Sequence, residues 1–154
     1  MTEDDGGFAE LVGTELSSAE EGRAAVSLKA EERHLNPSGT VHGGVISTLI
    51  DASMAEALNT MTEQDEQPFT IQITVNYMKP GKPGMLTSNA QVRKGGERIT
   101  IVEAEVVQED EDEVIALATG TYTPLARQAG KGTALVEYVS PQNSEVRTPY
   151  KAPL

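Results

Sequence analysis

Residues 42–60, HGGVISTLIDASMAEALNT, decide the fold that this sequence predicts. The segment is too long for a strand, and its Ala, Leu, Met and Glu content favours a helix of about 17 residues. Apolar residues lie on nearly every side of that helix, in which only Asp51 and Glu56 carry a charge. Such a helix has to be surrounded by the rest of the chain rather than laid on its surface.

Strand-like segments occur on both sides of the helix, and they are expected at residues 8–16, 23–29, 69–77, 85–93, 99–108 and 114–122. The third segment alternates apolar and polar residues, which predicts a strand with one buried face. The apolar residues expected on that face are Phe69, Ile71, Ile73, Val75 and Tyr77. The sum is an α+β fold, in which an antiparallel sheet of five to six strands packs around one helix.

The chain has 154 residues, 38% of them apolar, which is enough for one domain with a buried core. We expect this domain at residues 8–125, after a frayed N-terminus at residues 1–7. Residues 126–154 change character and are expected to form a tail of uncertain order. A short strand is possible within it, at residues 136–139.

The composition excludes several kinds of site. The absence of cysteine excludes a disulfide scaffold, a thiolate nucleophile and a Cys-bound metal, and two histidines argue against a His-rich metal site. The acidic run at residues 109–113 is interpreted as a solvated turn rather than a metal site. No segment reaches about 20 apolar residues and the N-terminus is acidic, which predicts a cytoplasmic protein rather than a membrane-bound or secreted one.

The chain carries 24 acidic and 12 basic side chains, a net charge of −12. This charge argues against nucleic acid or an anionic membrane as the main partner. Two explanations of it stay open. One is solubility, and the other is a high-salt cytosol, where screening reduces the cost of self-repulsion.

Asp51 lies in the middle of a helix that is expected to be buried. An unpaired buried carboxylate costs several kcal/mol, so one interpretation is a functional carboxylate. The other is that Asp51 faces a solvated stripe with Ser47 and Thr48, which lie four and three residues before it.

The sequence His42-Gly43-Gly44 opens the helix. Its first N–H groups have no partner within the helix, and the positive end of the helix dipole lies behind them. Such groups suit an oxyanion or a thioester carbonyl. Alternatively, the two glycines only permit close packing of helix and sheet.

Asp51 follows Gly43 by eight residues, which is about 12 Å along a helix. One copy of the helix therefore cannot bring both groups to one substrate carbonyl, whereas two antiparallel copies can. If both groups belong to one site, the protein is at least a dimer with sites shared across a two-fold interface.

The segment NPSGTVHGG at residues 36–44, Asp51, and the strand TIQITVNYMKP at residues 70–80 resemble the hotdog-fold acyl-CoA thioesterases. The resemblance covers about residues 8–125 and is strongest to the branch of the phenylacetate-pathway and 4-hydroxybenzoyl-CoA thioesterases. It implies an antiparallel sheet wrapped around a central helix, and hydrolysis of an acyl-CoA substrate without metal or bound cofactor. It also implies a homodimer as the smallest unit. A tetramer of two dimers is the commoner assembly in this branch, and the sequence leaves dimer and tetramer open.

The resemblance also implies roles for individual residues. Asp51 would be the nucleophile or the general base, and the Gly43 N–H would polarise the thioester carbonyl. Asn36 and His42 would line the site. Thr70 would bond the water or the carboxylate across the subunit interface. Some relatives carry Glu at the position of Asp51. Because this chain has Asp there, the paired-acid variant of those relatives is not expected here.

The phosphates of CoA require a local positive patch on this acidic protein. Arg98 and Lys94 are the preferred pair, and the substrate is also expected to contact Gly44 and Tyr77. Other candidate cations are Arg93, Lys79 and Lys82. The acyl group is left open between aryl and medium-chain, and its pocket is expected among Ile46, Leu49, Ile50, Met54, Tyr77 and Met78.

Two other functions remain possible from the sequence. One is a non-catalytic hotdog module that binds acyl-CoA. The other is a hotdog hydratase or dehydratase, which would need a histidine beside an acid, and His34 is the only histidine besides His42.

Overall fold

The computed structural model describes residues 7–126 of the chain. The predicted tail from residue 127 onward, with its possible strand at residues 136–139, lies outside the described residues. The elements follow in the order α1 (Gly7–Val12), β1 (Thr14–Glu20), β2 (Arg23–Ala30), η1 (Glu32–His34), α2 (Gly43–Asn59), β3 (Glu66–Tyr77), β4 (Gly84–Lys94), β5 (Thr100–Gln108), η2 (Glu109–Glu111) and β6 (Glu113–Ala126).

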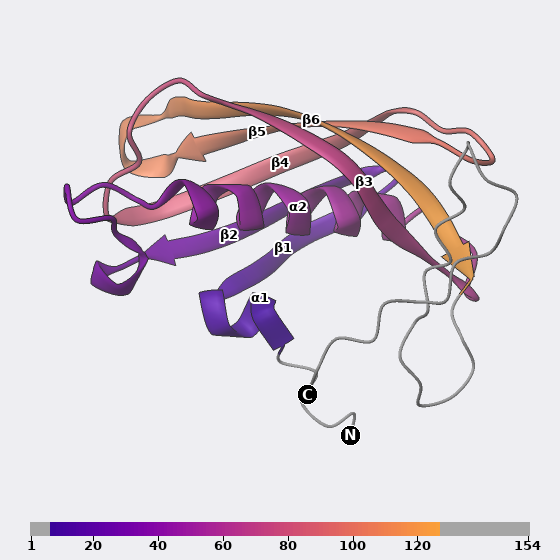
Figure 1. The fold of residues 1–154 in the computed structure, drawn as a ribbon, viewed down its shortest axis with the longest axis horizontal. Coiled ribbons are helices and arrows are strands. Elements are labelled where there is room, and N and C mark those ends of the chain that lie inside the picture. Colours follow the sequence, from indigo (N-terminus) through magenta and orange to yellow (C-terminus); the bar gives the residue numbers. More distant parts are fainter. Residues whose placement is uncertain (1–6, 127–154) are drawn as a thin grey trace, which may run out of the picture.

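The six strands form one antiparallel sheet of order β1-β2-β4-β5-β6-β3. The sheet curves around α2, so that β1 and β2 lie along one side of the helix and β3 along the other (Figure 1). This confirms the predicted α+β fold. The strand β3 follows α2 in the sequence but occupies an edge of the sheet, where β6 is its only partner among the described strands.

The helix α2 has 17 residues, as predicted, and its sheet-facing side forms the core. The buried residues of α2 are Ile46, Leu49, Ile50, Ser53, Met54, Ala57 and Leu58. Burial of each large apolar side chain stabilises the fold by about 1.5–3 kcal/mol. The expectation that Ile46, Leu49, Ile50 and Met54 line an acyl pocket is therefore wrong, because each is at most 2% exposed and packs against the sheet.

The first predicted strand, residues 8–16, is wrong in its first half. Gly7–Val12 form a short helix, and the strand β1 begins only at Thr14. Gly13 separates the two with a φ of +87°, a conformation that glycine adopts without strain, and its N–H closes the helix on the carbonyl of Ala9.

The strand β3 departs from the predicted alternation at one position. Thr70 is opposite Tyr122 in β6, whereas Gln72 is opposite Thr121, so Ile71 is the extra residue of a β-bulge. A bulge shifts the side-chain alternation by one residue. Sequence alternation continues through this point, so it carried no sign of the shift.

The bulge explains which residues of β3 reach the helix. Thr70 and Tyr77 both form hydrogen bonds with α2, although an odd spacing of seven residues would place them on opposite faces of a regular strand. Conversely, Phe69 and Ile71, which were expected on the buried face, are 39% and 53% exposed.

The acidic run at residues 109–113 is a turn, as predicted, formed by η2 and Asp112 with a φ of +49°. Within residues 7–126 no group of three or more acidic or histidine side chains is arranged to hold a metal ion. None of the helices in that part of the chain is long and apolar enough to cross a membrane.

Candidate active site

His42 caps the N-terminus of α2 with its side chain. The Gly44 N–H donates to Nδ1 of His42 at 2.9 Å, and a Cβ on Gly44 would also lie 2.9 Å from that nitrogen. Because Nδ1 accepts, the neutral ring carries its proton on Nε2, on an exposed side chain. Gly44 thus makes room for the His42 ring, and its N–H already has an acceptor.

Gly43 offers the free donor at this end of the helix. The N–H groups of Val45 and Ile46 donate to the carbonyl of His42, whereas the Gly43 N–H has no acceptor within residues 7–126. The Tyr77 hydroxyl donates to the Gly43 carbonyl at 3.1 Å and also contacts the Ser47 hydroxyl. Tyr77 therefore lies directly beside a free N–H at the positive end of the helix dipole.

Asn36 shapes the loop that leads to this end of the helix. Its Oδ1 accepts the N–H groups of Ser38 and Thr40 at 2.9 and 3.2 Å, and its Nδ2 donates to the Thr40 hydroxyl at 2.8 Å. These bonds close residues 36–40 and leave one Nδ2 hydrogen unused. The side chain of Asn36 thus holds the loop that precedes His42 and the start of α2.

Asp51 lies in the middle of α2 and is partly buried. Its Oδ1 accepts hydrogen bonds from the Thr70 hydroxyl at 2.9 Å and from the Tyr122 hydroxyl at 2.8 Å. Both of these bonds lie within one chain. The bond across the subunit interface that the resemblance implies for Thr70 stays a prediction. The carboxylate therefore has polar partners, rather than only a solvated stripe of helix.

Tyr122 is the site residue that the sequence reasoning missed. It lies in β6 and is only 1% exposed. Burial raises the pKa of its hydroxyl above the ordinary range, and the charge of Asp51 raises that pKa further. The hydroxyl therefore stays protonated and acts as a donor to the carboxylate. The only signal in the sequence was a tyrosine, an aromatic residue with a hydroxyl group, in a strand that is otherwise rich in small residues.

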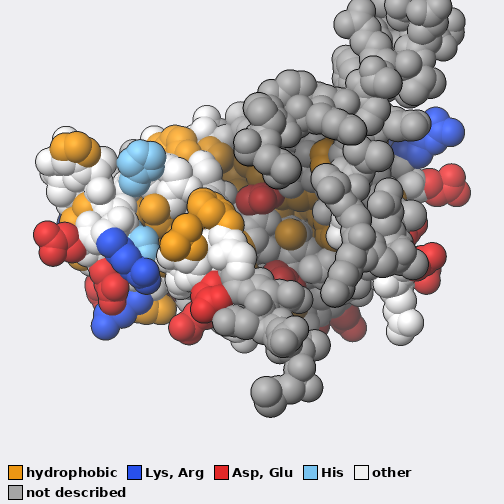
Figure 2. All heavy atoms as spheres, turned by 60° about the horizontal axis from the view of Figure 1, so that its bottom comes forward, with side chains coloured by type: hydrophobic (Ala, Val, Ile, Leu, Met, Phe, Trp, Pro, Cys, Tyr) orange, Lys and Arg blue, Asp and Glu red, His pale blue; other side chains and the backbone are white. Residues whose placement is uncertain are grey.

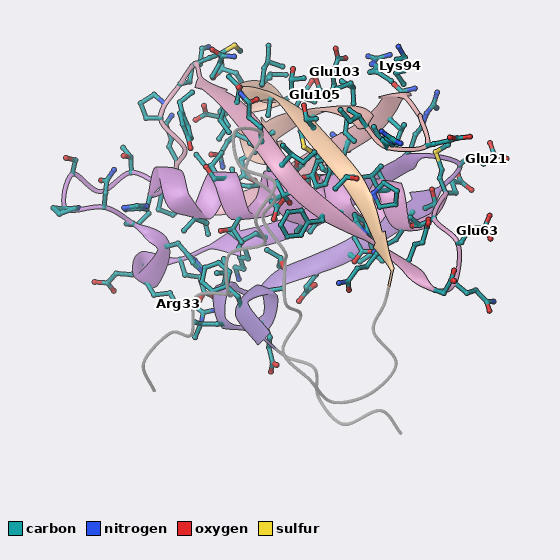
Figure 3. The ribbon with its side chains drawn as sticks, turned by 45° about the vertical axis from the view of Figure 1, so that its right-hand side comes forward. Glu21, Arg33, Glu63, Lys94, Glu103 and Glu105 are labelled. Carbon is teal, nitrogen blue, oxygen red and sulfur yellow. The ribbon has the colours of Figure 1, made fainter. Side chains whose placement is uncertain are left out.

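The candidate cations fall into two groups. Lys79, Lys82 and Arg93 form ion pairs with Glu113, Glu111 and Glu103, respectively. Lys94 and Arg98 form none within the described part of the chain. Figure 3 shows Lys94 at the upper right of the molecule, with Glu103 and Glu105 beside it along the top, and Arg33 at the lower left.

A cavity of about 150 Å³ lies beside the loop that joins Lys94 to Arg98. Gly95 and Gly96 of this loop line it, together with Leu58, Met61 and the ring of Tyr122. The preferred pair of cations therefore lies near the Asp51 side of the molecule, and not near the free N–H of Gly43.

His34 has no nitrogen available for proton transfer. Its Nδ1 accepts the Glu31 N–H at 2.9 Å and its Nε2 donates to the Val12 carbonyl at 2.8 Å, in a side chain that is 5% exposed. This arrangement joins α1 to η1 and gives no support to a hydratase that uses His34.

Comparison with known proteins bears directly on this geometry. Residues 38–115 match the thioesterase superfamily, a match that includes Gly43, Asp51 and Thr70. The chain belongs to the thioesterase superfamily. Membership makes it a thioester hydrolase with the hotdog fold, as the resemblance implied. The matched segment ends before Tyr122.

This chain is also similar to individual proteins, both in sequence and in structure. Acyl-coenzyme A thioesterase PaaI of Escherichia coli is 31% identical over 113 residues, which are 73% of this chain and 78% of that one. The 1,4-dihydroxy-2-naphthoyl-CoA hydrolase of Listeria monocytogenes is 30% identical over 105 residues, 68% of this chain and 85% of that one. The structure of a conserved protein of Pseudomonas aeruginosa is similar with a TM-score of 0.73 and 33% identity, covering 77% of this chain and 94% of that one.

Proposed function

We propose that this thioesterase hydrolyses an acyl-CoA ester to a carboxylic acid and CoA, with Asp51 and the Gly43 N–H as its catalytic groups. The observation that carries the proposal is the complementary pair on α2. The Gly43 N–H has no acceptor among the described residues 7–126, and Asp51 is a partly buried carboxylate. The relatives named as acyl-CoA thioesterase and as CoA-ester hydrolase support the choice of CoA as the thiol.

The two groups divide the chemistry between them. The Gly43 N–H stabilises negative charge that grows on the thioester oxygen. Asp51 either takes a proton from a water whose oxygen attacks the carbonyl carbon, or attacks that carbon itself to give an anhydride that water then hydrolyses. In both routes the C–S bond breaks and the CoA sulfur leaves as a thiolate that gains a proton. His42, with its proton on the exposed Nε2, offers a second donor near the carbonyl.

The distance between the groups supports a shared site in a homodimer. Eight residues of helix separate Gly43 from Asp51, about 12 Å, which is too far for one thioester carbonyl. The 12-residue edge strand β3 exposes apolar Phe69 and Ile71, and its outer edge has no partner strand among the described residues. Unpaired edges of this kind pair with another chain. We infer that β3 of two copies meet antiparallel, which brings Gly43 of one copy toward Asp51 of the other.

Two such dimers would form a tetramer. In light scattering, a mass of two or four chains supports this assembly, and a monomer that hydrolyses CoA esters contradicts it.

The CoA phosphates need cations on a surface that offers few. On the face shown in Figure 2, acidic side chains lie both at the rim and among hydrophobic groups near the centre, whereas Lys and Arg are confined to the rim. Lys94 and Arg98 are the cations free of ion pairs in the loop beside the cavity. Arg98→Glu should raise the KM for a CoA ester steeply and leave the fold intact, and an unchanged KM would remove Arg98 from the site.

The test of the proposal is hydrolysis of benzoyl-CoA and octanoyl-CoA, as aryl and medium-chain probes, with detection of the free thiol. Asp51→Asn should lower the rate about 10²- to 10⁴-fold. Near-full activity of that variant would overturn the assignment of Asp51. Binding of both esters by the wild-type protein without turnover would point instead to an acyl-CoA-binding module.

A further inference from the structure

The ring of Tyr122 lies in a space that exists because residue 120 is glycine. A Cβ on Gly120, two residues earlier in β6, would lie 2.6 Å from Sδ of Met54 and 2.7 Å from Cε2 of Tyr122. Only glycine at this position lets the Tyr122 ring lie between β6 and α2. The ring is fully enclosed, so its hydroxyl is held in one place relative to the helix.

The bulge in β3 brings a second hydroxyl to the same place. Because Ile71 is the extra residue, Thr70 lies opposite Tyr122 and faces α2 with it. The two hydroxyls come from adjacent strands of the sheet, and both are directed at one carboxylate of the helix.

Both donors bond the same oxygen of that carboxylate. Thr70 and Tyr122 donate to Oδ1 of Asp51, at 2.9 and 2.8 Å, whereas Oδ2 has no donor within residues 7–126. Two bonds, one of them from the enclosed Tyr122, restrict the orientation of the carboxylate and use the accepting capacity of Oδ1. Oδ2 keeps its lone pairs for another partner.

We propose that Tyr122 is a positioning residue which, together with Thr70, holds Asp51 by Oδ1 and presents Oδ2 to the reacting water or thioester carbon. This inference rests on the proposed function of Asp51. It adds a residue beyond the matched family segment, and it names which of the two oxygens reacts.

The state of the hydroxyl supports this role. Burial and the neighbouring carboxylate both raise the pKa of Tyr122 above its ordinary value of about 10, so at neutral pH the hydroxyl is protonated and donates. Because the ring is buried, Tyr122 acts on the substrate only through Asp51.

Tyr122→Phe tests the inference, because it removes the hydroxyl and keeps the ring in its slot. With whichever of benzoyl-CoA and octanoyl-CoA the wild type hydrolyses faster, we expect kcat to fall about 10- to 100-fold while KM changes less than about threefold. Thr70→Val should act in the same direction. Thr70→Ser, which keeps the second hydroxyl, should retain most of the wild-type kcat.

Ser88→Ala is the matched control. It removes another buried hydroxyl that bonds a side chain of α2, Ser53, at 2.7 Å. It should lower the melting temperature as Tyr122→Phe does but leave kcat unchanged, since Ser53 does not contact Asp51. Equal losses of kcat in the two variants would show that Tyr122 only stabilises the fold and would overturn the inference.

Two further outcomes would also overturn it: a wild-type kcat in Tyr122→Phe, or a loss confined to KM. Failure of the proposed function gives a different result. If Asp51→Asn keeps full activity, Asp51 is not the catalytic carboxylate. If Asp51→Asn is inactive while Tyr122→Phe matches the wild type, only the positioning role fails.

Discussion

The first turn of α2 and its middle turn carry complementary groups that are built in different ways. The first turn is assembled from neighbours in the sequence, since residues 36–44 supply its loop, its cap and its free N–H. The middle turn is assembled from residues 51, 70 and 122, which meet only because the sheet folds around the helix.

This difference predicts different sensitivities. The free N–H depends on one backbone atom and a local cap, so it should resist changes elsewhere in the fold. The orientation of the Asp51 carboxylate depends on the bulge at Ile71, on Gly120 and on the buried ring of Tyr122. It should therefore change when packing is altered at positions far from Asp51 in the sequence. The two regions can therefore be damaged separately.

After Asp51→Asn, the largest effect is expected from Gly43→Pro, which removes the free N–H. Proline is well tolerated at the first position of a helix, and His42 has the φ of −59° and ψ of +134° that suit a residue before proline. We expect kcat for thioester hydrolysis to fall about 10²- to 10³-fold.

Gly43→Ala is the control for that variant. It keeps the N–H, and its Cβ would lie an ordinary 3.5 Å from the Tyr77 ring. It should keep most of the activity. Equal losses in Gly43→Ala and Gly43→Pro would show that the N–H is not the important feature of this glycine.

The next largest effect is expected from Gly120→Ala, which fills the slot of the Tyr122 ring. The added methyl would collide with Met54 and Tyr122, and overpacking of this kind costs about 1–3 kcal/mol of unfolding free energy. Urea titration measures the loss. Gly95→Ala, where a Cβ meets nothing within 4 Å, should stay within about 0.5 kcal/mol of the wild type. Equal stability of the two variants would contradict the close packing of Tyr122 against Gly120.

A smaller effect is expected at alkaline pH. The pKa of Tyr122 is raised in the folded protein, whereas in the unfolded chain it is about 10. Its contribution to stability is therefore complete below about pH 10 and is lost as pH rises further, because only the unfolded chain releases the proton. The unfolding free energy of the wild type should decline faster above about pH 10 than that of Tyr122→Phe, and parallel declines would contradict the buried hydroxyl.

The smallest effect is expected from salt. A net charge of −12 destabilises a compact chain by self-repulsion, and the screening length falls from about 10 Å at 0.1 M to about 3 Å at 1 M salt. We expect the melting temperature to rise by several degrees between low and molar KCl. A melting temperature that is the same at both concentrations would remove the idea of adaptation to a high-salt cytosol.

The sequence was informative where structure is local. The bounds of α2, the turn at residues 109–113 and the four strands after α2 were predicted closely, because composition and alternation act over a few residues. The helix Gly7–Val12 was missed because six residues are too few to show a helical period. Neither the bulge at Ile71 nor the slot at Gly120 was visible, because each depends on register between strands.

The candidate site shows the same division. Asp51 and His42-Gly43-Gly44 stood out in the sequence as candidates, because a charge in a buried helix and paired glycines at its start are local anomalies. The contact between Asp51 and Tyr122, 71 residues apart, is set by sheet topology. The apolar helix residues Ile46, Leu49, Ile50 and Met54 were expected to line the acyl pocket but lie in the core, because an apolar helix face suits a core as well as it suits a ligand.

The central claim is that the donor of one chain and the carboxylate of another form one site. It is tested by mixing Asp51→Asn with Gly43→Pro and allowing their subunits to exchange. In a mixed dimer one site has both its Asp51 and its Gly43 intact, so the mixture should recover about a quarter of the wild-type thioester hydrolysis. Activity that stays at the sum of the two separate variants, although light scattering shows dimers and native mass spectrometry shows mixed dimers, would contradict the shared site.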